Sequence, residues 1–209
     1  MRSLTLVLLC WSICLGHNYG QSNPSKSKTY FTKQINSPIE IDGKLNDEAW
    51  EKVKWGKGFK QSEPEPDTKP SFATQFKILY DESYLYVGFR CFDDQPELIT
   101  GAITPRDFFD GDWVEINIDS DFDRKEAYSF TITAVGIRGD EYIKNADNWS
   151  NDWNPAWTAQ TQIDKQGWTA EIQIPLTELN ISKALPHWGI QVNRSMGRGD
   201  ESSSWIYIP

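Results

Sequence analysis

Aromatic and amide side chains alternate between residues 145 and 157, in the most unusual part of the sequence. This stretch reads Asn-Ala-Asp-Asn-Trp-Ser-Asn-Asp-Trp-Asn-Pro-Ala-Trp, with Trp149, Trp153 and Trp157 at four-residue spacing. Sugars present apolar C–H faces that stack on aromatic rings, and hydroxyls that hydrogen-bond to amides and carboxylates. Trp149 and Trp153 are therefore candidate sugar-binding residues; the alternative is that they pin the loop onto a core. Trp157 begins an alternating strand and is expected in the core.

A second stretch is dense in carboxylates and has the spacing of a cation site. Asp119, Asp121 and Asp123 follow a D-x-D-x-D pattern, which can wrap a hard cation such as calcium with oxygen ligands. An EF-hand loop would need Gly at the sixth place and Glu at the twelfth, where Arg124 and Phe130 stand. The stretch is thus a candidate calcium site outside the EF-hand class, or alternatively a solvated turn with Asp caps.

Catalytic groups are not recognisable in the sequence. The chain has two histidines, His17 and His187, no His/Cys cluster for zinc and no phosphate-binding glycine loop. Acidic residues are plentiful enough to supply the two carboxylates that a glycosidase needs. The sequence therefore predicts a binding domain without catalytic residues, with a glycoside hydrolase as the alternative.

Alternating apolar residues indicate the strands that must position these groups. Residues 72–80 and 84–92 are expected to form a β-hairpin around the turn at Asp81-Glu-Ser. In 113–119, alternation places Val114, Ile116 and Ile118 inward and Trp113, Glu115 and Asn117 outward. Further strands are expected at 128–132, 135–142, 157–163, 168–174, 188–193 and 205–208.

About nine short strands with few helix signals predict one domain of the all-β class. We expect an antiparallel β-sandwich of the jelly-roll or immunoglobulin-like kind. A short helical turn is expected after Asn46 or Asp47, through Trp50.

The N-terminus has the features of a secretory signal peptide. Arg2 precedes an apolar run over residues 4–15, which is too short to span a bilayer comfortably. We expect residues 1–20 to be the signal peptide, 21–32 a flexible linker and 33–209 the β-sandwich domain. An uncleaved N-terminal anchor is the alternative. An apparent strand runs to the last residue, which predicts that the chain is truncated from a longer polypeptide.

Charge excludes some classes of partner. Acidic side chains outnumber basic ones 30 to 21, for a net charge of −9. This balance disfavours nucleic acid and anionic membrane surfaces. Cleavage of the signal would remove two of the three cysteines and leave Cys91 alone, so the domain must be stable without an internal disulfide.

Five segments in order resemble the family 9 carbohydrate-binding modules and together cover nearly the whole mature chain. They are Ile41-Asp-Gly-Lys-Leu-Asn-Asp-Glu-Ala-Trp50, Leu79-Tyr-Asp-Glu-Ser-Tyr-Leu-Tyr-Val87, Asp112-Trp-Val-Glu-Ile-Asn-Ile-Asp119, Gly167-Trp-Thr-Ala-Glu-Ile-Gln-Ile-Pro175 and Trp188-Gly-Ile-Gln-Val-Asn-Arg194. The stretch from Asn193 to Trp205 looks like the version of this module found at the N-terminus of large bacterial envelope proteins. In those proteins a poorly characterised β-rich region follows the module.

The resemblance implies a β-sandwich with bound calcium that clamps a terminal sugar between two aromatic rings. Glu115 matches the family's sugar-binding glutamate, and Gln191 and Asn193 are its expected amide partners. Phe109 stands where the family has one clamping Trp, and Trp205 is the expected match to the other. Because Phe gives a weaker stack than Trp, the alternative partners for the stack are Trp113 and the loop with Trp149 and Trp153.

The expected function is carbohydrate binding by a non-catalytic module of a secreted or cell-envelope protein that takes part in carbohydrate catabolism. Its expected partners are an oligo- or polysaccharide and the downstream β-rich domain, and the module itself is expected to be monomeric. Export to the periplasm, the outer membrane or cell surface, or the extracellular space is expected. A structural docking domain of an outer-membrane β-rich protein is a further alternative.

Overall fold

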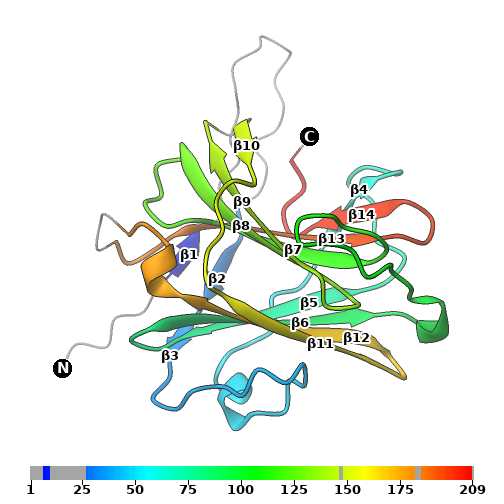
Figure 1. Cartoon of the computed structure of the whole chain (residues 1–209), viewed down its shortest axis with the longest axis horizontal. Helices are drawn as coiled ribbons and strands as arrows, with labels where there is room; N and C mark the ends of the chain where they lie inside the picture. Colours follow the sequence, from blue (N-terminus) through cyan, green and yellow to red (C-terminus); the bar gives the residue numbers. More distant parts are fainter. Residues whose placement is uncertain (1–6, 10–26, 146–147, 182–184, 209) are drawn as a thin grey trace.

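Two sheets lie face to face and enclose the core in this computed structural model, which describes residues 7–9, 27–145, 148–181 and 185–208 (Figure 1). The seven-stranded sheet contains, in spatial order, β10 (Asn148–Ser150), β9 (Arg138–Lys144), β8 (Glu126–Thr133), β7 (Trp113–Asp119), β13 (Gly189–Met196), β14 (Glu201–Ser204) and β4 (Lys60–Glu63). The five-stranded sheet contains β11 (Thr158–Asp164), β12 (Gly167–Pro175), β6 (Tyr84–Phe92), β5 (Thr74–Tyr80) and β3 (Lys33–Gln34).

All strand pairs in these sheets are antiparallel except β3 with β5. The predicted all-β sandwich is confirmed, with more strands than the nine expected. The extra strands are short edge strands such as β3, β4 and β10, which have two to four residues and cannot display an alternating pattern. Short 3-10 turns are η1 (Glu48–Lys52), η2 (Pro96–Leu98) and η3 (Leu176–Glu178); η1 confirms the predicted helical turn.

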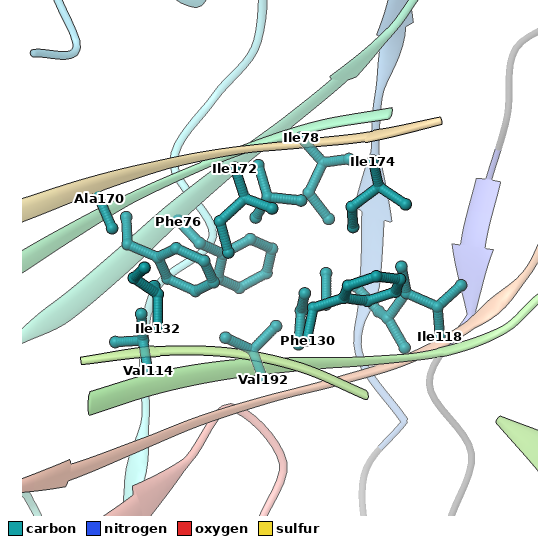
Figure 2. Close-up of a cluster of buried hydrophobic side chains, with 14 of the residues drawn as sticks. Phe76, Ile78, Val114, Ile118, Phe130, Ile132, Ala170, Ile172, Ile174 and Val192 are labelled. Atoms are coloured by element: carbon teal, nitrogen blue, oxygen red, sulfur yellow. The ribbon is translucent and has the colours of Figure 1, made fainter. Parts of the chain in front are cut away.

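The core is filled by the inward side chains of both sheets. Figure 2 shows Phe76, Ile78 and Ile172 of the five-stranded sheet opposite Val114, Phe130 and Val192 of the seven-stranded sheet. All six side chains are fully buried. In β7 the alternation is as predicted, because Val114, Ile116 and Ile118 point inward and leave the residues between them for the outer face.

The outer face of the five-stranded sheet is covered by the segment that carries η1 (Figure 1). Leu79 and Tyr86 point away from the central core and pack in a second buried cluster with Ile35, Ile39 and Trp50. Strands β5 and β6 are therefore buried on both faces, which removes the polar alternation expected of a half-exposed hairpin.

Glu171 is the polar anchor of this covering segment. Its carboxylate is buried on β12 and accepts hydrogen bonds from Trp50 Nε1 at 2.9 Å, Gly43 N at 3.0 Å and Asp42 N at 3.1 Å. Three donors satisfy the oxygens, as a buried carboxylate requires. Two of the segments that carry the family resemblance, 41–50 and 167–175, therefore meet at this carboxylate.

Protonation of Glu171 is expected to make the fold more stable at mildly acidic pH. Burial raises its pKa from 4.5 to about 7, against the lowering effect of the three donors. The folded protein thus holds this proton more tightly than the unfolded chain, so stability present below pH 4.5 is lost as the pH rises through about 7. This group alone is expected to lower the free energy of unfolding by about 2 kcal/mol between about pH 5 and pH 7. Urea unfolding at both pH values measures the change. Glu171→Gln is expected to flatten it, and an unchanged pH slope in that variant would contradict the assignment.

The predicted linker at 21–32 contains a strand of the described structure. Residues 21–26 of the predicted linker lie outside the described residues, but Thr29–Phe31 form β2, which pairs with β1 (Val7–Leu9) in a separate two-stranded sheet. Tyr30 is buried, and its hydroxyl donates to Lys54 O and accepts from Ile78 N. Tyr30 and Phe31 are adjacent in a polar stretch and form no alternating pattern, so the sequence did not reveal this anchor.

Apart from Val7–Leu9, the predicted signal peptide at 1–20 lies outside the described residues. Within the described part of the chain, no helix has the length and apolar character needed to cross a bilayer.

Candidate functional site

Polar side chains gather on the outward face of the seven-stranded sheet, opposite the core. Trp113, Glu115 and Asn117 of β7 project to this face. Thr131 of β8 and Asn193 of β13 stand directly beside Glu115 in the two neighbouring strands. Since directly opposed residues share one face of a sheet, the register places amide, hydroxyl and carboxylate groups side by side.

Glu115 is held rigidly at the centre of this face. Its side chain is only 8% exposed. Its Oε2 accepts from Asn193 Nδ2 at 2.6 Å and Asn117 Nδ2 at 2.8 Å, and its Oε1 accepts from Ser129 Oγ at 2.9 Å. Donors from three strands therefore fix the carboxylate, which retains lone pairs for a hydroxyl of a ligand.

Phe109 lies over the same face because a loop folds back onto β9. In the loop, Asp107 N donates to Arg138 O at 3.1 Å, and Asp107 Oδ1 accepts from Asp140 N at 3.1 Å. The ring then rests against Gly139, where an added Cβ would lie 2.2 Å from Phe109 Cζ. Only glycine allows this close approach.

The buried Asp140 carboxylate strengthens the same anchor from the core side. It forms an ion pair with Arg106 of the loop and accepts from Trp157 Nε1 at 2.9 Å. Burial raises the pKa of Asp140, against the lowering effect of these two partners. Trp157 is in the core, as predicted.

Phe109 and Trp113 form an aromatic platform next to Glu115. Phe109 is 37% exposed and Trp113 is partly buried. Their ring centroids are 6.3 Å apart and their planes are inclined by 43°. A sugar ring between two aromatic rings needs about 7–8 Å, which is two carbon contacts of about 3.5–4 Å. The pair therefore offers a surface for stacking rather than a gap that admits a sugar.

Trp205 does not face this platform, so the prediction that it forms the second side of a clamp is wrong. Its ring is 3% exposed and packs edge-on against Phe76 of the five-stranded sheet, with centroids 5.0 Å apart. Its Nε1 donates to Lys57 O at 3.1 Å. Strand β14 ends at Ser204, and the ring of the next residue fills space in the core between the two sheets.

Trp153 and Trp149 lie apart from Glu115. Trp153 packs on the core residues Tyr128 and Phe130, with ring centroids 5.0 and 5.5 Å away, so it closes the sandwich and is not positioned for a ligand on the outward face. Trp149 is 46% exposed on the outward face, opposite Ile143. Its strand β10 is three strands from β7, about 14 Å at the usual strand spacing.

The two predicted amide partners have different roles. Asn193 donates to Glu115 as described above. Gln191 instead uses both ends of its amide on the backbone of Ile206, donating to its O at 2.7 Å and accepting from its N at 3.3 Å. Gln191 therefore positions the segment after β14 and is not free for a ligand.

The predicted calcium ligands serve a turn after β7. Asp119 accepts from the backbone N of Asp123 and Arg124, and Asp123 accepts from Lys125 N. Within the described ranges no three His, Cys, Asp or Glu side chains, including Asp121, converge as metal ligands. Backbone N–H groups thus occupy both carboxylate oxygens of Asp119 and one of Asp123, and the calcium site that the spacing predicts stays a prediction.

Sequence reasoning missed two residues of this face, Ser129 and Glu141. Ser129 is buried beneath Glu115, and Glu141 pairs with Ser129 across β8 and β9. The pKa of Glu141 is raised by burial and then by the negative charge of Glu115. Alternation along β8 and β9 could have placed both residues outward, but their proximity to Glu115 depends on the register.

Comparisons with known proteins agree with this fold. A family model described as "Carbohydrate family 9 binding domain-like" matches residues 41–205. Two solved structures of a family 9 carbohydrate-binding module from Caldicellulosiruptor kristjanssonii are similar in fold. The complex with cellotriose has a TM-score of 0.58 and 17% identity, over 84% of this chain and 87% of that chain. The complex with glucose has a TM-score of 0.56 and 18% identity, over 84% and 91%. Comparison with curated protein sequences finds no match.

Proposed function

The chain belongs to the carbohydrate family 9 binding domain-like family, and from this premise we propose that it binds carbohydrate, without catalysis, through the outward face around Glu115. The ligand stacks on the platform of Phe109 and Trp113 and hydrogen-bonds to Glu115. Similar modules have been solved with glucose and with cellotriose, which supports neutral gluco-oligosaccharides as the first ligands to test.

One observation carries the proposal: a glutamate that is only 8% exposed on the outer side of a sheet, with its carboxylate oriented by three donors, lies beside the half-exposed ring of Phe109 and the partly buried ring of Trp113. A purely structural role for the Glu115 carboxylate would not account for the aromatic surface that Phe109 and Trp113 present to solvent beside it. Hydrogen bonds to an ionised acceptor are stronger than neutral ones, and aromatic rings supply the apolar contact that a pyranose needs.

The shape of the site sets the expected strength of binding. An open platform covers one face of a sugar, and association costs offset much of the contact energy. Affinities on the order of micromolar to millimolar are therefore expected.

We also propose that the domain is a module of an exported, glycan-processing protein. The apolar run over residues 4–15 after Arg2, which has the features of a signal peptide, supports export.

Isothermal titration with gluco-, xylo- and manno-oligosaccharides tests the function. At least one series is expected to give heat at millimolar ligand, and Trp113→Ala is expected to weaken that binding about tenfold or more, since stacking and apolar contact are lost. Trp149→Ala, which removes an exposed ring of the same face, is the matched control and is expected to bind as the parent does. No heat with any oligosaccharide would refute the function, and equal binding by Trp113→Ala would refute the platform.

A further inference from the structure

A large cavity of the described structure lies away from the outward face around Glu115. It has a volume of about 890 Å³ and opens between the segment 28–34, which contains β2 and β3, and the segment 52–57. The buried ring of Trp205 forms part of its floor. Volumes in this range are typical of sites for small ligands.

Positive charge is concentrated around this cavity. Five of its fourteen described lining residues are lysines, namely Lys28, Lys33, Lys52, Lys54 and Lys57, and none of the fourteen is Asp or Glu. In a chain with 30 acidic and 21 basic residues, the opposite excess would be expected. The lining therefore has the charge to attract an anion.

Four of these ammonium groups are not neutralised within the described residues. The ion pairs there use Lys44, Lys60, Lys77 and four arginines. The side chains of Lys33, Lys52, Lys54 and Lys57 form no ion pair or hydrogen bond in that part of the chain. Lys28 has another role: its Nζ donates to Gly58 O and Trp205 O, both at 2.5 Å, and so ties the two walls together.

Apolar side chains complete the cavity. Phe31 is 62% exposed at its rim, an unusual position for a large aromatic residue, and Trp55 is partly buried in the facing wall. Tyr30 and Val53 are buried beneath them. The lining thus combines an apolar surface with a rim of cations, and these two features fit opposite ends of one molecule.

We propose that this cavity binds an amphipathic anion, with a phosphate or carboxylate head at the lysines and an apolar chain along Phe31 and Trp55. The lysines supply charge-assisted hydrogen bonds, and the apolar wall excludes water from the chain. A neutral sugar would leave the four ammonium groups without a partner. This site is independent of the carbohydrate-binding face, because the two share no residue.

Titration of the full chain with four probes separates the contributions to binding. Dodecyl phosphate below its micelle concentration carries both the anion and the chain, dodecanol below its solubility limit and dodecylammonium carry the same chain with no charge and with a positive charge, and inorganic phosphate carries the anion alone. Saturable binding is expected for dodecyl phosphate, at least tenfold tighter than for any of the others. If dodecanol or dodecylammonium binds as tightly as dodecyl phosphate, the cavity offers only a non-specific apolar surface. If inorganic phosphate binds as tightly, the cavity is a simple anion site. Either result overturns the proposal.

A double variant, Lys54→Gln with Lys57→Gln, tests the cation rim. It is expected to bind dodecyl phosphate about tenfold more weakly, since each exposed charge pair contributes modestly. Lys125→Gln with Lys165→Gln removes two lysine charges from exposed positions elsewhere and is the matched control. An unaltered affinity of the double variant, with its thermal unfolding unchanged, would overturn the site. Sedimentation of the chain with anionic phospholipid vesicles separates a single bound molecule from a membrane surface, and efficient sedimentation would overturn the single-molecule proposal.

Discussion

Glutamine in place of Glu115 is expected to weaken oligosaccharide binding between about tenfold and a hundredfold. Loss of a charge-assisted hydrogen bond to a sugar hydroxyl accounts for about 1.5–3 kcal/mol. The substitution also points an N–H₂ group at donors, because Asn117, Ser129 and Asn193 all donate to the present carboxylate. The side chain at position 115 is therefore expected to change its orientation as well as lose its charge.

Isothermal titration of parent and variant with the best oligosaccharide measures the loss. Glu141→Gln is the matched control, since Glu141 has the same charge on the same face and its side chain accepts no hydrogen bond from within the described residues. It is expected to change affinity less than threefold. If both variants weaken binding equally, the negative charge of the face matters and the three-donor arrangement does not.

Alanine in place of Trp205 is expected to lower the free energy of unfolding by about 3–5 kcal/mol. The ring is buried between the sheets against Phe76, and its removal leaves a cavity that the surrounding strands cannot fill. The hydrogen bond from Trp205 Nε1 to Lys57 O is lost as well. An interior role thus replaces the sugar contact that the sequence suggested.

Urea unfolding of Trp205→Ala and of Trp149→Ala distinguishes the two roles. The second variant removes a ring that is nearly half exposed and is expected to change stability by less than about 1 kcal/mol. A Trp205→Ala protein that is as stable as the parent but no longer binds oligosaccharide would restore Trp205 to the sugar site.

The sandwich could be predicted from the sequence because burial leaves a local pattern in a strand. Alternation in β7 assigned Val114 to the core and Glu115 to the outward face of the sheet, and both assignments are confirmed, although neighbouring side chains bury Glu115 on that face. In β5 and β6 the predicted hairpin is confirmed, but the pattern did not reveal that Leu79 and Tyr86, on the opposite face, are buried by a segment 26 or more residues earlier in the chain. An alternating pattern of apolar and polar residues is expected only where one face of a strand is exposed to solvent, and both faces of these strands are buried.

The site could be predicted only in part, since its contacts depend on strand register. Glu115, Asn193 and Phe109 lie together as the resemblance implies, although Phe109 meets Trp113 and not Trp205. Gln191 and Asn193 are two residues apart and both project outward, so the sequence treats them alike. Only the nearby backbone of Ile206 separates their roles.

The hydrogen bond between Trp50 and Glu171 bears on how such modules are recognised. The two residues lie 121 positions apart, in two of the segments that make the sequence identifiable, and both are far from the rings and carboxylate that would meet a sugar. A chain that keeps both residues is expected to share this cover on one sheet, whatever its ligand. These segments therefore identify an architecture, and assignment of a ligand to such a chain requires inspection of the positions that match residues 109–117 and 193.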